Sequence, residues 1–308
     1  MTLAPAVLVT CGGTVAMQAG VDGLRRPSGS GPVVQVVQHL AGAPIPSYSA
    51  CEIDSGQSTP QTWGHILSTV RRAHSQHPGV PVLVSHGTDT LGWTAGMLAA
   101  AGGWDVPVVL TASAIPLGDP YSDAETNLAG ALAVAQHADP GVYVSFSGSR
   151  GQSSRVFQGG YVRKTGMSPQ LFSAVGHPLG EARGGFFIQQ HEPRQIPVQL
   201  RSDNFDSQVL LVRSNPAVNA QFYVHACELH PPAAVVIETY VCGTAPDDMV
   251  LLTSKLVGLG IPVLACPPVP LGQAQYPHIE ALREAGAQVR LDATVELLVP
   301  YAASGGGR

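Results

Sequence analysis

The chain has 308 residues, which is long enough for two domains. Hydrophobic residues make up 44% and charged residues only 12%, so we expect part of the surface to be buried against another subunit. The net charge of −5, without clusters of lysine or arginine, argues against nucleic acid and anionic membranes as partners.

The cysteine pattern argues against a disulfide framework and a structural zinc site. The count is odd and no CxxC spacing occurs. The histidines show no HxxxH or HExxH spacing, so we predict no metal. The apolar residues 3–9 lack a basic leader and run into Gly12-Gly13, which favours a first strand over a signal peptide. No segment approaches the length of a membrane span, and we expect a cytoplasmic protein.

Predicted strands and helices alternate through the first half of the chain. Strands are expected at residues 7–10, 48–54, 80–85, 106–111 and 141–146, with helices at 33–40, 60–77, 91–101 and 123–136. This alternation predicts a parallel sheet with crossover helices. Residues 18–32, rich in Gly, Pro, Arg and Ser, have the composition of a loop long enough to be a mobile lid.

A second α/β domain is predicted after a boundary region rich in Gly, Pro, Gln and Arg. A weakly alternating hairpin at 155–163 precedes this region and ends at Lys164. Beyond it, strands are expected at 209–212, 233–237 and 262–265, with helices at 247–259 and 278–285. The prediction is a larger N-terminal parallel-sheet domain (1–190), a linker (191–206), a smaller C-terminal α/β domain (207–303) and a disordered tail (304–308).

Polar residues follow two of the predicted buried strands. Cys11-Gly-Gly-Thr14 follows the first, and Ser85-His-Gly-Thr-Asp-Thr90 follows the strand at 80–85. Ligands of α/β proteins bind beyond the carboxyl ends of strands, so these turns are candidate site segments. Capping of the next helix by Thr88 or Asp89 is the alternative explanation.

Thr14 is a candidate nucleophile, although a threonine hydroxyl is weak until a base activates it. Thr88, Asp89 and Lys164 would form a hydroxyl–carboxylate–amine relay if Lys164 is not simply a surface lysine. Cys11 is a rival nucleophile, with a buried inert thiol as its alternative. His86 is either a base or a hydrogen-bonded structural residue. Dinucleotide, P-loop and GxSxG signatures are absent.

Several segments together resemble the bacterial-type L-asparaginase family. Val7-Leu-Val-Thr-Cys-Gly-Gly-Thr-Val-Ala16 is similar to its TGGTIA-like turn, and Val82-Leu-Val-Ser-His-Gly-Thr-Asp-Thr-Leu91 to its THGTDT-like strand end. Weaker similarities lie at Ile53-Asp-Ser55, Asp123-Ala-Glu-Thr-Asn-Leu128, Val162-Arg-Lys-Thr165, Glu238-Thr-Tyr240 and Gly243-Thr-Ala-Pro246.

The resemblance implies two α/β domains and hydrolysis of the side-chain amide of asparagine, and sometimes glutamine, without a cofactor. It implies that Thr14 forms the acyl-enzyme. Thr88, Asp89 and Lys164 would transfer protons and hold the α-amino end of the substrate, and Ser55, with the backbone around Gly56, would bind its α-carboxylate. Backbone N–H groups near Thr88 and Ala114 are candidates for the oxyanion site.

The resemblance also implies a homo-oligomer, either dimer or tetramer, whose partner chain completes the site. Thr244 or Gln273 is a candidate for that contribution. The chain departs from the family pattern in its loop, which has no tyrosine between Thr14 and Tyr48 but carries Arg25 and Arg26. An amino-acid-binding homologue with little catalysis, or a hydrolase of a related amide such as glutamine, remains the alternative.

Overall fold

The computed structural model describes residues 5–20, 22–151, 153–167, 170–205, 208–274 and 276–307. The chain divides into two compact units, unit 1 over Met1–Gln195 and unit 2 over Ile196–Arg308. The division lies inside the segment 191–206 that we predicted as a linker. Each unit has its own sheet and its own buried apolar core.

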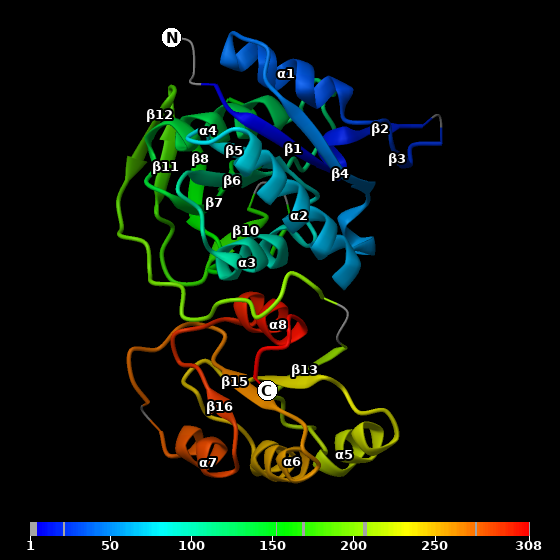
Figure 1. The fold of residues 1–308 in the computed structure, drawn as a ribbon, viewed down its shortest axis with the longest axis vertical. Helices are drawn as coiled ribbons and strands as arrows, with labels where there is room; N and C mark the ends of the chain where they lie inside the picture. Colours follow the sequence, from blue (N-terminus) through cyan, green and yellow to red (C-terminus); the bar gives the residue numbers. More distant parts are fainter. Residues whose placement is uncertain are drawn as a thin grey trace. The chain divides into compact units, whose positions relative to one another are not determined.

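Unit 1 is built on an eight-stranded sheet with the order β12-β11-β8-β7-β6-β5-β1-β4 (Figure 1). Five neighbouring strands are parallel: β1 (Val7–Gly12), β4 (Ser47–Ile53), β5 (Val82–Ser85), β6 (Pro107–Thr111) and β7 (Gly141–Phe146). Three antiparallel strands extend the sheet beyond β7: β8 (Ser154–Gln158), β11 (Gly180–Arg183) and β12 (Phe186–Gln189). The parallel strands are β-branched and almost wholly buried, except for the edge strand β4.

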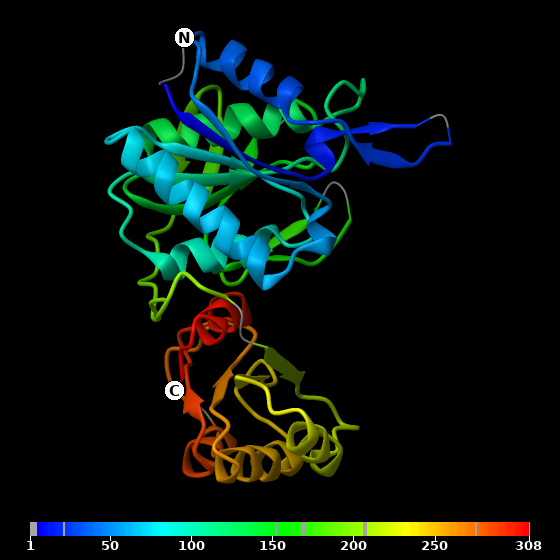
Figure 2. The ribbon, with the colours of Figure 1, turned by 45° about the vertical axis from the view of Figure 1, so that its right-hand side comes forward.

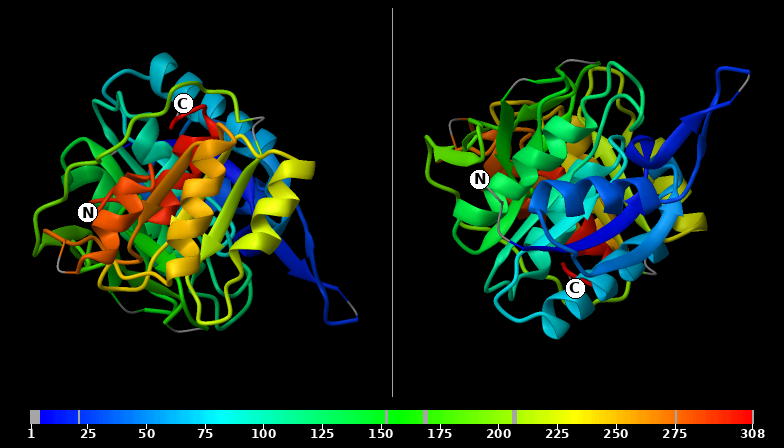
Figure 3. Two further views of the ribbon diagram at one scale, coloured as in Figure 1. Left: turned by 90° about the horizontal axis from the view of Figure 1, so that it is seen from below. Right: turned by 90° about the horizontal axis from the view of Figure 1, so that it is seen from above.

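Helices cover both faces of this sheet, as Figure 3 shows from above. On one face, α1 (Gly31–Ala41) packs beside α4 (Ala124–His137), and their apolar residues share a core with Leu8, Leu83 and Val109. On the other, α2 (Pro60–Gln76) contacts β4 and β1, and α3 (Leu91–Ala101) contacts β7 and β6. Thr59 caps α2 and Pro60 occupies its first turn.

The strand order places a topological switch point between β1 and β5. From β1 the chain passes to β4 on one side, and from β4 it crosses to β5 on the other side of β1. A crevice forms beyond the carboxyl ends of strands at such a point and is the usual ligand site of open α/β sheets. Residues 14 and 88 follow the two strands that flank it.

Two smaller pairs of strands lie outside the main sheet. β9 (Val162–Lys164) pairs antiparallel with β10 (Phe172–Ala174). β2 (Met17–Ala19) and β3 (Arg25–Pro27) form a hairpin that projects from unit 1 in Figure 2. The hairpin falls in residues 18–32, which we expected to be a loop.

Unit 2 has a four-stranded parallel sheet, β13-β14-β15-β16. Its strands are β13 (Val209–Arg213), β14 (Ala234–Glu238), β15 (Val263–Cys266) and β16 (Gln288–Val289). One face is covered by α5 (Ala220–Leu229), α6 (Asp247–Gly258) and α7 (His278–Glu284), which lie side by side in Figure 3. α8 (Val295–Ala303) packs on β13 and β14. The predicted fold class, α/β with a larger parallel-sheet domain and a smaller α/β domain, is confirmed.

The end of the chain differs from the disordered tail that we predicted. Residues 304–307 form turns, and residue 308 lies outside the described part. Ser304 is buried because its hydroxyl accepts the Arg201 N–H at 3.0 Å and donates to the Tyr301 carbonyl at 2.7 Å. The Gly307 carbonyl accepts a bond from Gln288 at 2.7 Å. The glycine-rich composition suggested disorder, but these contacts within unit 2 order the segment.

None of the helices in the described ranges is long and apolar enough to cross a membrane.

Candidate active site

The turns after β1 and β5 meet at two glycines. Gly13 has φ 78° and ψ −179°, a conformation essentially restricted to glycine. A Cβ on Gly13 would lie 2.3 Å from the Gly87 Cα, so no side chain fits there. This close approach sets the turn that begins with Thr14 against the turn that holds Thr88.

Lys164 reaches the same place from β9. Its ammonium donates to the Thr88 hydroxyl at 2.9 Å and to an Asp89 carboxylate oxygen at 2.6 Å. The strand that carries Lys164 lies against the first turn of α3, where a Cβ on Gly92 would be 2.6 Å from the Val162 carbonyl oxygen. The predicted relay residues Thr88, Asp89 and Lys164 are therefore in direct contact, and the interpretation of Lys164 as an unpartnered surface lysine is wrong.

A pocket of about 220 Å³ opens over these side chains. The residues that line it are Thr14, Arg25, Thr88, Asp89, Ala114, Lys164, Met167 and Leu171. All four predicted catalytic residues are among them. Thr14 follows β1, Thr88 and Asp89 follow β5, and Ala114 follows β6, so three neighbouring strand ends contribute. Within the described chain, the Thr14 hydroxyl makes no hydrogen bond.

Ser55 lies beside the pocket and contacts the Asp89 backbone. It is 2% exposed, and its hydroxyl oxygen accepts the Asp89 N–H at 3.2 Å. Gly56 is exposed, and a Cβ there would lie 3.6 Å from an Asp89 carboxylate oxygen. Neither residue is among the described residues that line the pocket. Their predicted contact with the substrate carboxylate remains a prediction.

Asp123 at the start of α4 holds the turn after β6. Its carboxylate accepts the Ala114 N–H at 3.0 Å and the Ile115 N–H at 3.1 Å. Asn127 supports it by donating to Asp123 and to the Ala112 carbonyl, both at 2.8 Å. The Ala114 N–H is thus occupied by Asp123. The expectation that backbone N–H groups near Ala114 help to form the oxyanion site stays a prediction.

His86 is a structural residue. Its Nδ1 lies 2.8 Å from the Gly87 carbonyl oxygen and its Nε2 lies 3.1 Å from the Thr94 hydroxyl. Complete burial lowers the pKa of the imidazole, and the bond to Gly87 only partly opposes this shift. A neutral ring that donates through Nδ1 and accepts through Nε2 satisfies both contacts.

Cys11 lacks the properties of a free nucleophile. It is 1% exposed, and the adjacent Cys51 thiol together with burial raises its pKa well above the ordinary value. Cys51, on neighbouring β4, donates to the Cys11 carbonyl at 3.7 Å. Because the thiolate is the reactive form, a raised pKa makes Cys11 the less reactive of the two thiols.

Three pocket residues were not predicted as site residues: Arg25, Met167 and Leu171. Arg25 comes from the β2–β3 hairpin and donates to the Ala114 carbonyl at 3.0 Å. In the sequence, the absence of a tyrosine from this loop drew attention to the segment. It did not indicate which of Arg25 and Arg26 faces the pocket. Met167 and Leu171 flank residues 168 and 169, which the structure does not describe.

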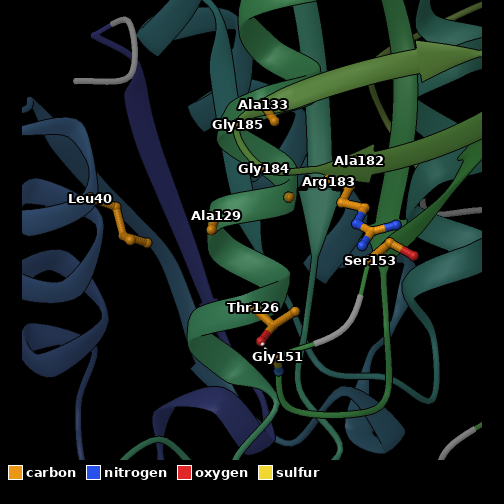
Figure 4. A pocket seen from close by; sticks show the side chains of 11 residues that line it. Leu40, Thr126, Ala129, Ala133, Gly151, Ser153, Ala182, Arg183, Gly184 and Gly185 are labelled. Carbon is orange, nitrogen blue, oxygen red and sulfur yellow. Dashed lines mark hydrogen bonds between the residues drawn. The ribbon is translucent and has the colours of Figure 1, made fainter. Parts of the chain in front are cut away.

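A larger hollow of about 440 Å³ lies elsewhere in unit 1 (Figure 4). It is bounded by α1, by α4 and by the turn between β11 and β12, with Arg183 beside Ser153 at its edge. Among the described residues that line it, Arg183 is the one charged side chain, and no carboxylate or imidazole is present. This hollow therefore lacks a base beside a nucleophile, and we place the candidate active site in the smaller pocket, which Thr14 lines. No cluster suited to hold a metal ion occurs within the ranges that the structure covers.

Comparisons with known proteins identify the family of this chain. Residues 6–193 match the family model described as "Asparaginase, N-terminal". The L-asparaginase of Thermococcus kodakarensis is 28% identical over 240 residues, which cover 76% of this chain and 70% of the relative. L-asparaginase 1 of Escherichia coli K12 is 26% identical over 313 residues, covering 92% and 86%.

The fold agrees as well. The solved structure of the thermostable L-asparaginase from Thermococcus kodakarensis superposes with a TM-score of 0.82, at 24% identity, over 99% of this chain and 94% of that one. The family model spans more than half of the chain and includes every residue of the pocket. The chain therefore belongs to the asparaginase family.

Proposed function

We propose that this protein is an amidohydrolase that cleaves the side-chain amide of L-asparagine to L-aspartate and ammonia, with Thr14 as the nucleophile. The observation that carries the proposal is the convergence of Thr14 with the hydrogen-bonded cluster of Lys164, Thr88 and Asp89 around one pocket. Membership of the asparaginase family and the names of the relatives support this choice of substrate.

The chemistry has two halves. In the first, the Thr14 oxygen bonds to the amide carbon, the C–N bond breaks, and the hydroxyl proton leaves with the amine as ammonia. In the second, water attacks the resulting ester, releases aspartate and returns a proton to Thr14. Two steps through an ester are easier than direct attack of water on an amide. The cluster of Thr88, Asp89 and Lys164 is the route for these protons.

Substrate recognition follows from charge. Asp89 is 55% exposed at its side chain and offers a carboxylate to the α-ammonium group. Ser55 and the backbone near Gly56, beside Asp89, are proposed to hold the α-carboxylate. Leaving either end of a zwitterion unmatched would weaken binding by ~1–3 kcal/mol or more. No cofactor takes part in the proposed reaction.

Two further points belong to the proposal. The protein acts as a homo-oligomer, which agrees with its low fraction of charged residues. Asparagine is preferred over glutamine, although one methylene is usually worth only ~1–3 kcal/mol of discrimination. A non-catalytic, amino-acid-binding role is the competing function.

Ammonia release from purified protein tests the proposal. We expect release from L-asparagine by the wild type and none above background from Thr14→Ala that keeps its melting temperature. Parallel assays with L-glutamine rank the two amides. Binding of L-aspartate without ammonia release from either amide would establish the binding role instead.

A further inference from the structure

The β2–β3 hairpin carries two adjacent arginines with different surroundings. Arg25 and Arg26 are neighbours in β3, so their side chains leave opposite faces of the strand. Arg26 pairs with Asp22 through two bonds of 2.8 and 2.6 Å, and this contact lowers the pKa of Asp22 to about 2. Arg25 instead lines the pocket with Thr14 and Lys164. Only one of the two cations faces the site.

The hairpin is tied to the nucleophile turn at its base. The backbone N–H and the hydroxyl of Ser28 both donate to the Ala16 carbonyl, at 2.9 and 3.0 Å. Ala16 ends the short helix that begins at Thr14, and β2 follows it directly. Arg25 adds a second tie through its 3.0 Å bond to Ala114. The base of the hairpin is therefore bound to the turn that carries Thr14, and the Arg25 guanidinium is bound to the turn after β6.

Most of the donors of Arg25 are unused. The bond to Ala114 takes one N–H, and the guanidinium has no other partner within the described parts of the chain. A guanidinium carries several further N–H donors in a rigid plane, together with a positive charge. These donors and their charge are available to whatever enters the pocket.

The proposed reaction needs hydrogen-bond donors around the carbonyl oxygen that is attacked. A tetrahedral intermediate places negative charge on the former amide oxygen, and preorganised donors must stabilise it. The N–H groups of Ala114 and Ile115 are already taken by Asp123. The N–H groups of Thr14 and Thr88, both pocket residues, have no partner within the described residues, so Arg25 would act beside these backbone donors.

The charged residues that line the pocket also favour an interaction of Arg25 with negative charge on the substrate. Two cations, Arg25 and Lys164, and one carboxylate, Asp89, face it. Lys164 and Asp89 bind each other at 2.6 Å and largely offset one another. The positive charge of Arg25 is left without a counter-charge, which matches the single negative charge that develops on the substrate.

We infer that Arg25 is an oxyanion-stabilising catalytic residue of this pocket. The inference rests on the proposed function and adds to it a residue that recognises negative charge at the scissile end of the substrate. Arginine cannot accept the Thr14 proton, so its contribution is electrostatic. Proton acceptance then falls to the cluster around Lys164.

Kinetics of two arginine variants test this inference. We expect Arg25→Gln to lower kcat about 10²-fold with little change in KM, because the interaction exists only in the transition state. Arg25→Lys, which keeps a charge, should recover part of the loss. Arg26→Gln on the same strand, facing away, should behave as the wild type. A raised KM with unchanged kcat, or full activity in Arg25→Gln, would overturn the inference.

A binding measurement separates this inference from the proposed function. In the Thr14→Ala background, which cannot turn over substrate, calorimetry compares L-aspartate with L-asparagine. The aspartate side chain places a negative charge where the oxyanion forms, so Arg25→Gln should weaken aspartate ~10-fold or more and asparagine far less. If Arg25→Gln weakens both ligands equally, or if aspartate does not bind, the inference fails even when wild-type protein releases ammonia. If aspartate is selectively weakened but the wild type releases no ammonia, the proposed function fails and the anion-recognising role of Arg25 stands.

Discussion

Gly13 and Gly87 touch backbone to backbone at the switch point of the sheet, and a Cβ on Gly13 would lie 2.3 Å from the Gly87 Cα. The contact joins the two turns that present Thr14 and Thr88. Residues without a side chain are therefore needed at this point to form the pocket as well as the turn.

Replacing Gly13 by alanine should lower both stability and activity. The substitution is strained at φ 78° and ψ −179° and also clashes with Gly87. We expect a loss of about 3 kcal/mol or more in the free energy of unfolding. Gly79→Ala is the matched control, since Gly79 has φ 76° but a Cβ added there would have no atom within 4 Å. It should lose only about 1–2 kcal/mol. Equal losses in urea unfolding would contradict the packing argument.

Replacing Gly92 by alanine should reduce activity through the position of Lys164. Alanine in a helix is ordinarily favoured over glycine by about 1 kcal/mol. Here its Cβ would meet the Val162 carbonyl at 2.6 Å and push β9 away from α3. We expect lower kcat, with no gain in melting temperature. A more stable, fully active variant would show that β9 does not need this contact to place Lys164.

The contacts of Asn127 predict its contribution to stability. Its side chain donates to Ala112 and Asp123, and accepts the Ser147 N–H at 2.7 Å, all inside the protein. Asn127→Ala removes the bonds to the Ala112 carbonyl and the Ser147 N–H and one of the bonds to Asp123, at about 1–3 kcal/mol for each buried group left unpaired. Chemical denaturation should register the loss, while Asn204→Ala, at an exposed position, should have little effect. A loss below about 1 kcal/mol at Asn127 would argue that water replaces the bonds.

His86 predicts part of the pH dependence of stability. Burial lowers its pKa in the folded state below the ordinary value of 6.5. As pH falls below that value, the unfolded chain takes up a proton that the folded protein does not, so stability is lost by at most about 1.4 kcal/mol per pH unit. His86→Gln, whose amide can donate to Gly87 and accept from Thr94, should flatten this slope. Parallel slopes for the two proteins between about pH 7 and 5 would rule out the assignment.

The cysteine pair predicts an order of thiol reactivity. The Cys11 thiol next to it lowers the pKa of Cys51, whereas that of Cys11 is raised. Iodoacetamide should therefore modify Cys51 before Cys11 in the native protein, as peptide mass spectrometry can determine. Cys11→Ala should retain ammonia release, because the proposed nucleophile is Thr14. Loss of activity in a folded Cys11→Ala protein would instead support Cys11 as the nucleophile.

Much of the fold follows from local patterns in the sequence. Apart from the edge strand β4, the parallel strands of unit 1 are short apolar runs between loops rich in glycine and polar residues, and the predicted helices lie between them. α5 and α8 were not predicted. α8 contains Pro300 in its interior, which ordinarily argues against a helix, and it forms because its apolar residues are buried on β13 and β14.

The site was predictable in its residues but not in its hydrogen bonds. Thr14, Thr88 and Asp89 follow strands that any parallel-sheet prediction would bring together, whereas Lys164 comes from a separate small strand pair. The occupation of the Ala114 N–H by Asp123 depends on how α4 begins, which strand and helix patterns do not specify. The choice between Arg25 and Arg26 depends on the register of β3 against β2.

Trapping the covalent intermediate tests the central claim most directly. Protein turning over L-asparagine is quenched rapidly in acid and digested, and its peptides are sequenced by mass spectrometry. The account predicts one aspartyl group in ester linkage on Thr14, still present in Cys11→Ala and absent in Thr14→Ala. An adduct that persists in Thr14→Ala, or one that maps to Cys11, would contradict it.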